Sequence, residues 1–155
     1  MSRWPRWIDR TDANLREIAP GLYVGSKFAP SIMPPGDTMW GLVVDACGSS
    51  LDPSWEHKYL LAREVVAMPF SDGDPIPAGA LDVVAPLVER TLAINEPVLV
   101  HCAAGLSRSA SIGYALLRRM HGLGHEDALA RVYAGDPTYP LLPTLNSARA
   151  WARRT

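Results

Sequence analysis

Val98-Leu-Val-His101-Cys102-Ala-Ala-Gly-Leu-Ser-Arg108-Ser109 is the stretch of the sequence that decides the fold. Its three apolar residues follow Pro97 and predict a short buried strand. A helix is predicted next, over residues 110–120, because basic residues and Gly122 mark its end. A loop that leads into a helix start directs several backbone N–H groups and the positive end of the helix dipole at one point. The stretch therefore predicts an anion-binding loop between a buried strand and a helix.

Two side chains of this loop add chemistry to the anion site. The electropositive loop favours the thiolate form of Cys102, which is the nucleophilic form of that side chain. Arg108 closes the loop with a planar guanidinium whose donors match two phosphate oxygens at once. The loop is therefore predicted to combine a nucleophile with a phosphate clamp. The alternative is a buried strand that ends in a structural cysteine.

The order His101-Cys102, five residues, Arg108 and Ser109 resembles the signature of the cysteine-dependent protein tyrosine phosphatase superfamily. The whole loop is most similar to that of the dual-specificity phosphatases. The preceding strand, Gly105 and the following helix make the match specific, and the resemblance covers roughly residues 18–152. It implies an α/β fold in a single domain, with a central, mostly parallel sheet of about four to five strands flanked by helices.

The resemblance implies a role for each residue of the loop. Cys102 attacks phosphorus and forms a phosphocysteine, and the Ser109 hydroxyl donates a hydrogen bond to its sulfur. Arg108 and the backbone N–H groups of the loop hold the phosphate oxygens as charge develops on them. His101 is implied to be structural, with its ring hydrogen-bonded to the loop backbone. The implied substrate-binding residues are Ala103, Ala104, Gly105, Leu106, Ser107 and Arg108.

The reaction also needs a general acid, because expulsion of an alkoxide or phenoxide from phosphorus is slow unless the leaving oxygen is protonated. The resemblance implies an aspartate on a loop upstream of the nucleophile, at a spacing of about 30 residues. In the turn-rich segment 71–77, Asp72 lies 30 residues before Cys102 and Asp74 lies 28 residues before it. Phe70-Ser71-Asp72 resembles the family's context of a strand followed by the aspartate, which favours Asp72 as the acid. Asp74 is the alternative. The other aspartate is expected to cap a turn.

A second cysteine follows another predicted strand, over residues 40–45. Ligands of open α/β sheets lie at the carboxyl ends of the strands, and Cys47 stands at such an end, as Cys102 does. By the resemblance, Cys47 is expected to be a redox partner that forms a reversible disulfide with Cys102. The alternative is that Cys47 is a small buried hydrophobic residue.

Periodicity and turn residues predict the remaining elements. Trp55 is expected to pack on the surface, and the alternative is that it borders the substrate cleft. Residues 18–25 are predicted to form a turn and a first short strand, and residues 64–70 another strand. The predicted helices span residues 52–61, 77–95, 125–134 and 141–154.

Length and charge limit the class of protein. The chain has 155 residues, of which 48% are hydrophobic and 20% charged, as is typical of one globular domain. We assign residues 1–17 to an N-terminal extension and residues 18–155 to the phosphatase catalytic domain, with Trp4 and Trp7 folded back on that domain. The net charge of −1 favours neither nucleic acid nor an anionic membrane as a partner.

Cysteine and histidine usage limits the environment and the cofactors. Two cysteines do not form the disulfide framework of a small secreted protein, and no signal peptide or membrane-spanning run is evident, so a cytoplasmic monomer is expected. The four histidines show no metal-ligand spacing other than that of His121 and His125, which flank a Gly-Leu-Gly turn. Neither a metal nor another cofactor is therefore expected.

The predicted function is that of a phosphoprotein phosphatase that hydrolyses phosphotyrosine, with phosphoserine and phosphothreonine as further substrates of the class. Superfamily members that act on phosphoinositides often carry basic residues at the variable loop positions, which here are 103, 104, 106 and 107 and carry none. The resemblance therefore implies a single phosphate on a protein or peptide. One alternative is a phosphoinositide or other small phosphomonoester phosphatase of the same superfamily. The other is a non-catalytic phosphate-binding module.

Overall fold

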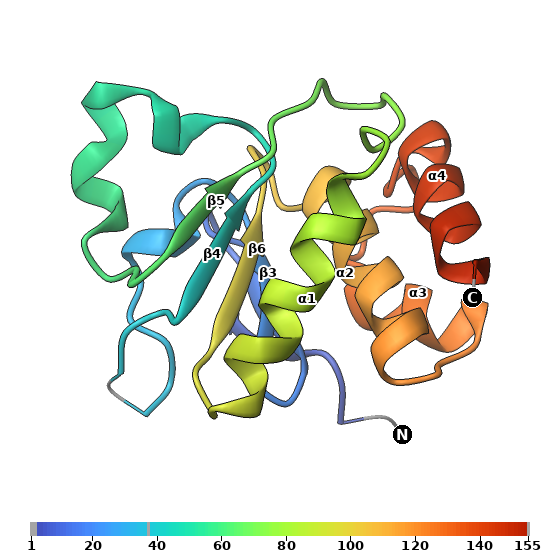
Figure 1. The fold of residues 1–155 in the computed structure, drawn as a ribbon, viewed down its shortest axis with the longest axis horizontal. Coiled ribbons are helices and arrows are strands. Elements are labelled where there is room, and N and C mark those ends of the chain that lie inside the picture. The colour runs from blue at the N-terminus through green and yellow to red at the C-terminus, as the bar shows by residue number, and fades with distance from the viewer. Residues whose placement is uncertain (1–2, 37, 155) are drawn as a thin grey trace.

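The computed structural model describes residues 3–36 and 38–154, and a six-stranded sheet forms its centre (Figure 1). The strands are β1 (Arg6–Asp9), β2 (Leu15–Ala19), β3 (Leu22–Gly25), β4 (Leu42–Asp45), β5 (Val65–Ala67) and β6 (Val98–His101). Their order is β1-β2-β3-β6-β4-β5, in which the last four strands are parallel and the β1–β2 and β2–β3 pairs are antiparallel. The predicted single-domain α/β fold with a mostly parallel sheet is confirmed, with six strands in place of the expected four to five.

The strands beyond the expected number come from the N-terminal part of the chain. β1 pairs with β2, and β2 pairs with β3, so the sheet runs across the expected boundary between residues 17 and 18. Residues 6–17 of the expected N-terminal extension therefore lie in this antiparallel part of the structure or in its connecting turn. All five residues of β2 are buried, although Arg16 and Glu17 are charged. Two adjacent charged residues interrupt the apolar pattern of a buried strand, which is why β2 was not predicted.

The helices lie mainly on one side of this sheet. They are α1 (Ala80–Ala93), α2 (Arg108–Met120), α3 (His125–Val132) and α4 (Leu142–Arg153). In Figure 1 they lie together to the right of the strands, with α2 between the sheet and α4. The short 3-10 helices η1 (Ala29–Ser31), η2 (Ser49–Leu51) and η3 (Pro53–Tyr59) follow β3 and β4.

Successive residues of the parallel strands enter two different hydrophobic cores. In β3, Leu22 and Val24 belong to the larger core with the helices, whereas Tyr23 belongs to a smaller core with Trp40 and Leu99. β4 and β6 follow the same alternation. Full burial of a Leu or Val side chain contributes roughly 1.5–3 kcal/mol, so a register slip that exchanged the two faces is strongly disfavoured.

Several element ends differ from the predicted ones for local reasons. α1 begins at Ala80 and not at Pro77, because Gly79 precedes it in a left-handed conformation with φ of 81°. α1 ends at Ala93, and Asn95 follows with φ of 59°. The helix predicted over residues 52–61 is the 3-10 helix η3, whose N-cap Asp52 accepts a hydrogen bond from Ser54 N–H as expected for a capping aspartate.

In the described part of the chain, no helix combines the length and the apolar character that a membrane span requires.

Candidate active site

The ends of the parallel strands bring the predicted site residues to one edge of the sheet. In the strand register, His101 of β6 lies between Gly25 of β3 and Asp45 of β4. The Cys102 loop, which we define as residues 102–108, begins directly after β6 and leads into α2. It therefore lies at the carboxyl ends of the strands, where open α/β sheets bind their ligands.

The sulfur of Cys102 is enclosed by the loop that follows it. Cys102 is 2% exposed, and its Sγ lies 3.1 Å from Ser109 Oγ in the first turn of α2. The Gly105 N–H donates to the same sulfur across 3.3 Å. Hydrogen-bond donors directed at a cysteine sulfur favour its thiolate form. The structure thus brings together the predicted nucleophile, a loop amide and Ser109.

Gly105 occupies a position that no other residue fits. Its φ is +78°, and a Cβ atom on it would lie 2.7 Å from the Gly25 carbonyl carbon and 2.8 Å from the Ser26 nitrogen. These are main-chain atoms of the sheet edge, which cannot rotate away as a side chain can. Any side chain here must therefore move the loop away from β3.

If the loop hydrolyses phosphate esters as its sequence predicts, we expect Gly105→Ala to lower that turnover by about 10²-fold, because displacement of the loop misdirects its amides. The left-handed backbone alone costs an alanine about 1–2 kcal/mol. The measurements are kcat with an aryl phosphate and the urea midpoint of unfolding. Gly124→Ala is the matched control, since its φ is not positive and no atom lies within 4 Å of the added Cβ. Equal turnover of Gly105→Ala and wild type would contradict this assignment of the loop.

Arg108 links the Cys102 loop to the segment that holds the predicted acid. Its Nη1 donates to the Phe70 carbonyl across 2.9 Å, and its Nε lies 3.8 Å from Asp72 Oδ1. The Arg108 side chain is 13% exposed, whereas that of Asp72 is 48% exposed and faces solvent as well. The buried Arg108 Nε has no hydrogen-bond partner in the structure. The Arg108 guanidinium thus has a free donor at the site. It also holds residues 71–77, which we call the acid segment, beside the Cys102 loop.

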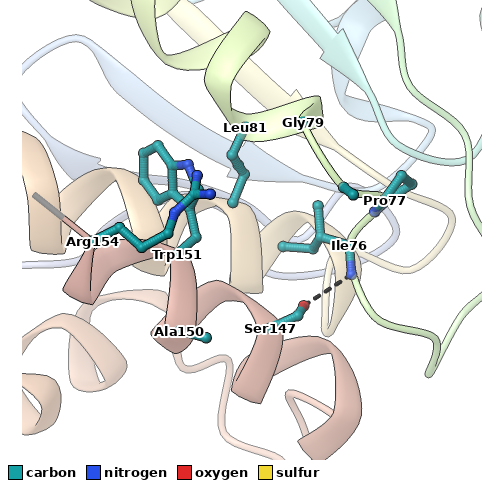
Figure 2. Close-up of a pocket in the computed structure, with 9 residues that line it drawn as sticks. Ile76, Pro77, Gly79, Leu81, Ser147, Ala150, Trp151 and Arg154 are labelled. Carbon is teal, nitrogen blue, oxygen red and sulfur yellow. Dashed lines mark hydrogen bonds between the residues drawn. The ribbon is translucent and has the colours of Figure 1, made fainter.

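Asp74, the alternative acid, is fixed by two hydrogen bonds of its backbone. Its carbonyl accepts a hydrogen bond of 2.7 Å from the buried Thr144 Oγ1 of α4, and its N–H closes a turn on Ser71 O. Farther along, the Ile76 N–H donates to Ser147 Oγ across 2.9 Å, as Figure 2 shows. α4 therefore anchors the far end of the acid segment, and Asp72 rather than Asp74 forms an ion pair with Arg108.

The other substrate-binding candidates in the loop differ in exposure. Ala104 is exposed, and Ala103 and Leu106 are half-buried. Ser107 is buried, and its hydroxyl accepts the Leu141 N–H across 3.0 Å. The Ser107 side chain is therefore occupied in joining the loop to the start of α4, so binding of an anion there falls to main-chain N–H groups.

His101 is fully buried behind the loop and contacts three groups. Its Nδ1 lies 3.4 Å from the Cys102 carbonyl, and its Nε2 lies 2.9 Å from Tyr59 Oη and 3.5 Å from Asp45 Oδ1. Burial lowers the pKa of His101 below its usual value, although Asp45 opposes the shift. We assign the proton of the neutral ring to Nδ1, because a carbonyl can only accept. The predicted contact between the His101 ring and the loop backbone is present, and its role remains a prediction.

Asp45 is a site residue that the sequence pattern did not identify. Its buried carboxylate accepts hydrogen bonds from the N–H groups of Cys47, Gly48 and Ser50 and from the Ser50 hydroxyl. Burial raises the pKa of Asp45, but His101 and the Ser50 hydrogen bonds outweigh it, so this pKa lies below its usual value. The available signal was an aspartate followed by Ala-Cys-Gly-Ser-Ser, which is typical of a turn closed by the aspartate side chain.

Among the described residues, one group has the spacing of a metal site. It consists of one ligand atom each from Asp45, Cys47 and His101, and these atoms lie within 4.8 Å of one another. The Asp45 carboxylate already accepts several hydrogen bonds, and the Tyr59 hydroxyl lies against His101 Nε2. The ligand atoms of Asp45 and His101 are therefore already engaged in a hydrogen-bonded cluster, which lies behind the loop.

Cys47 lies at the carboxyl end of β4, and its thiol is free, as is that of Cys102. The Cys47 Sγ lies 3.4 Å from Asp45 Oδ1 and 3.5 Å from Ser49 Oγ. Burial raises the pKa of Cys47, the Ser49 contacts oppose the rise, and Asp45 adds to it. Cys47 and Arg108 line the same cleft, which has a volume of about 320 Å³. The disulfide with Cys102 stays a prediction.

Mild peroxide is expected to join Cys47 to Cys102. Peroxide converts the Cys102 thiolate to a sulfenic acid, and the Cys47 sulfur displaces water from it to form the disulfide. Mass spectrometry of a non-reduced digest detects the crosslinked peptides. In the control Cys47→Ser, Cys102 is expected to proceed to the sulfinic acid. Oxidation of Cys102 without a crosslink in the wild-type protein would show that Cys47 is only a packed residue.

No protein-family model matches the sequence, and no curated protein matches it. Solved structures do match. Tk-PTP in its active form aligns with a TM-score of 0.72 at 21% identity, over 91% of this chain and 97% of that chain. Human DUSP28 aligns with a TM-score of 0.66 at 19% identity, over 96% of each chain. A cysteine-to-serine variant of P. aeruginosa TpbA in complex with pTyr aligns with a TM-score of 0.64 at 18% identity, over 98% of this chain and 91% of that chain.

The chain therefore has the fold of the cysteine-dependent tyrosine and dual-specificity phosphatases. The match spans nearly the whole chain. The family resemblance that the Cys102 loop predicted is thereby confirmed for the fold.

Proposed function

We propose that this protein is a phosphatase that hydrolyses phosphotyrosine in proteins or peptides through a phosphocysteine intermediate, with phosphoserine and phosphothreonine as further substrates. One observation carries the proposal: the Cys102 sulfur faces a loop amide and Ser109, while Arg108 of the same loop lies beside Asp72. A nucleophile, a phosphate clamp and a proton donor are the three parts that hydrolysis of a phosphomonoester requires.

In the first step, the Cys102 thiolate attacks phosphorus and the bond from phosphorus to the leaving oxygen breaks. Asp72 gives its proton to that oxygen, so that an alcohol or phenol leaves and not its anion. The loop N–H groups and Arg108 hold the three remaining phosphoryl oxygens, on which negative charge is concentrated in the transition state. The 3.8 Å distance between Arg108 Nε and Asp72 Oδ1 supports this arrangement, since an acid must lie close to the clamp to reach the leaving oxygen.

In the second step, water attacks the phosphocysteine. The Asp72 carboxylate takes a proton from the water, the new bond from oxygen to phosphorus forms, and the bond from phosphorus to sulfur breaks. Inorganic phosphate leaves, and Cys102 is again a thiolate. Ser109 Oγ, at 3.1 Å from the sulfur, donates a hydrogen bond to the leaving thiolate.

The cleft beside the loop supports an aromatic leaving group. Trp55 of η3 lines it together with Lys27, Ala103 and Arg108, so Trp55 borders the cleft instead of only packing on the surface. A phosphotyrosine whose phosphate occupies the loop would extend its ring into this cleft. Aromatic pairs of that kind contribute about 0.5–1.5 kcal/mol of binding free energy beyond the contribution of the area they bury. The pTyr bound to the TpbA variant, which has the same fold, is consistent with such a substrate.

The phosphoinositide alternative is favoured by Lys27. Its ammonium lies 5.0 Å from the centre of the Trp55 ring, in the same cleft, where it would meet a second phosphate. The loop itself provides no basic side chain other than Arg108, so Lys27 is the group to vary. Lys27→Ala is expected to weaken turnover of a phosphoinositide more than turnover of a phosphotyrosine peptide.

The test is phosphate release from peptides that carry phosphotyrosine, phosphoserine or phosphothreonine and from a phosphoinositide, with wild type and Lys27→Ala in parallel. We expect the highest kcat/KM with the phosphotyrosine peptide. A higher value with the phosphoinositide, lost in Lys27→Ala, would replace this proposal with the alternative. No release from any substrate, combined with binding of a phosphopeptide, would identify a phosphate-binding module.

A further inference from the structure

Three successive carbonyls of the Cys102 loop are hydrogen-bonded from outside the loop by the N-terminal part of the chain. The Lys27 N–H donates to Ala103 O across 3.2 Å. The side chains of the other two donors lie at the start of β2. Asn14 Nδ2 donates to Ala104 O across 2.9 Å, and Arg16 Nη2 donates to Gly105 O across 3.0 Å.

These contacts set the direction of the loop amides. A peptide unit is planar and trans, so its C=O and the N–H of the next residue point in opposite directions. A carbonyl held on the outside of the loop therefore turns the following N–H towards the inside. The Ala104 unit shows this directly, because its carbonyl accepts from Asn14 while the Gly105 N–H points at Cys102 Sγ.

Arg16 does more than satisfy a carbonyl, because it brings a charge into the interior. It is 0% exposed, and its guanidinium also donates to Asn14 O and Val132 O. Its Nε has no hydrogen-bond partner, and none of the ion pairs among residues 3–36 and 38–154 includes it. Burial lowers the pKa of Arg16 to about 10, and Cys102 opposes the shift, so the guanidinium is charged at neutral pH.

A buried charge without a counter-ion is costly, and an apolar side chain of the same size would usually be more stable. Three backbone carbonyls and the Trp7 ring, whose centre lies 5.4 Å from the guanidinium carbon, offset part of this cost, and a nearby anion offsets more of it. The Cys102 thiol lies at the centre of the loop, and the titratable groups around it are Arg16 of β2, Lys27, Asp45 of β4, Cys47, Asp52, Asp72, His101 of β6 and Arg108 of α2. Of these, the thiolate of Cys102 is the anion that the loop encloses.

We propose that Asn14 and Arg16 are positioning residues of this site, which hold the loop amides towards the phosphoryl group, and that the buried charge of Arg16 stabilises the Cys102 thiolate. The effect on turnover rests on the proposed phosphatase function, whereas the effect on the thiolate does not. Neither residue touches the substrate; both act through the loop.

The experiment compares three variants in a Cys47→Ser background, so that Cys102 is the only cysteine that iodoacetamide can alkylate. Arg16→Met removes the charge and the donors, Arg16→Lys keeps the charge, and Asn14→Gly removes one donor while tolerating the local φ of 44°. Arg10→Met, an exposed arginine that stacks on Trp7, is the matched control. The measurements are the urea midpoint, the rate of iodoacetamide alkylation against pH, and kcat and KM for an aryl phosphate.

Arg16→Met is expected to move the midpoint of alkylation to higher pH and to lower kcat by about 10²-fold, with a smaller change in KM. Arg16→Lys is expected to keep the alkylation midpoint near that of the parent and to restore part of kcat. Asn14→Gly is expected to lower kcat and to move the midpoint less than Arg16→Met does, because it releases the Gly105 N–H that points at the sulfur but removes no charge. Arg10→Met is expected to change neither quantity.

A folded Arg16→Met with the alkylation midpoint and kcat of the parent overturns the proposal. If Arg16→Met does not fold, Asn14→Gly decides, and an unchanged kcat in that variant overturns it. If the parent protein hydrolyses no phosphate ester, the phosphatase assignment fails, and the alkylation midpoint of Arg16→Met or Arg16→Lys still decides whether Arg16 stabilises the thiolate. Failure of the positioning role and failure of the proposed function are thus distinguishable.

Discussion

Cys102→Ser is expected to lower phosphatase turnover by at least about 10⁴-fold, because a serine hydroxyl in this loop is a far weaker nucleophile than a thiolate. The substitution exchanges sulfur for oxygen in a residue that is 2% exposed, so the fold has little reason to change. Loss of the negative sulfur also removes repulsion against a bound phosphate. Cys102→Ser is therefore expected to bind a phosphotyrosine peptide at least as tightly as wild type.

The measurements are kcat with an aryl phosphate and the affinity for a phosphotyrosine peptide by calorimetry. Rapid acid quenching of the wild-type reaction, followed by mass spectrometry, is expected to show a phosphoryl group on the peptide that contains Cys102. Cys47→Ser is the matched control and is expected to keep its turnover under reducing conditions. Residual activity of Cys102→Ser in the wild-type range would refute the phosphocysteine mechanism.

Asp72→Ala is expected to lower turnover by about 10²–10⁴-fold, the usual scale for a general acid, whereas Asp74→Ala is expected to lower it little. Asp72 forms the ion pair with Arg108 next to the Cys102 loop. Asp74 contributes its carbonyl to Thr144, and alanine retains that carbonyl. The loss in Asp72→Ala should also depend on the substrate, since only a poor leaving oxygen needs the proton.

A phosphotyrosine peptide and an aryl phosphate with a more acidic phenol separate the two roles. For Asp72→Ala, the loss with the peptide should exceed the loss with the activated ester. The same leaving-group dependence in Asp74→Ala, and its absence in Asp72→Ala, would make Asp74 the acid. Equal losses with both substrates in Asp72→Ala would show that its carboxylate supports the loop through Arg108 without donating a proton.

Much of the parallel part of the sheet could be predicted from local pattern. β6, the Cys102 loop and α2 follow one another as a run of apolar residues, a loop with glycine and a helix, and each signal lies within a few residues of the element it describes. β4 and η3 were predicted for the same reason. β2 could not be predicted, since Arg16 and Glu17 conceal a fully buried strand. Two of the carbonyls that accept from Arg16, those of Gly105 and Val132, belong to distant parts of the chain.

The candidate site divides in the same way. Cys102, Arg108 and Ser109 are recognisable because their spacing within one loop carries the chemistry, and Asp72 was reached by its spacing from that loop. Asp45 and Tyr59 were not recognisable, because their contacts with His101 join segments that lie far apart in the sequence. Trp55 was expected mainly on the surface, and its place in the cleft depends on how η3 lies against the loop.

By itself, the sequence determined an anion-binding loop with a cysteine at its start and an arginine at its end, held between a strand and a helix. That much is local, because the conformation of a short loop follows from its glycine and from the elements on either side. The tertiary structure decided what supports the loop, since Asn14 and Arg16 reach its carbonyls only once β2 has paired in the sheet. Support of this kind depends on hydrogen bonds between residues about 90 positions apart, which no local pattern encodes.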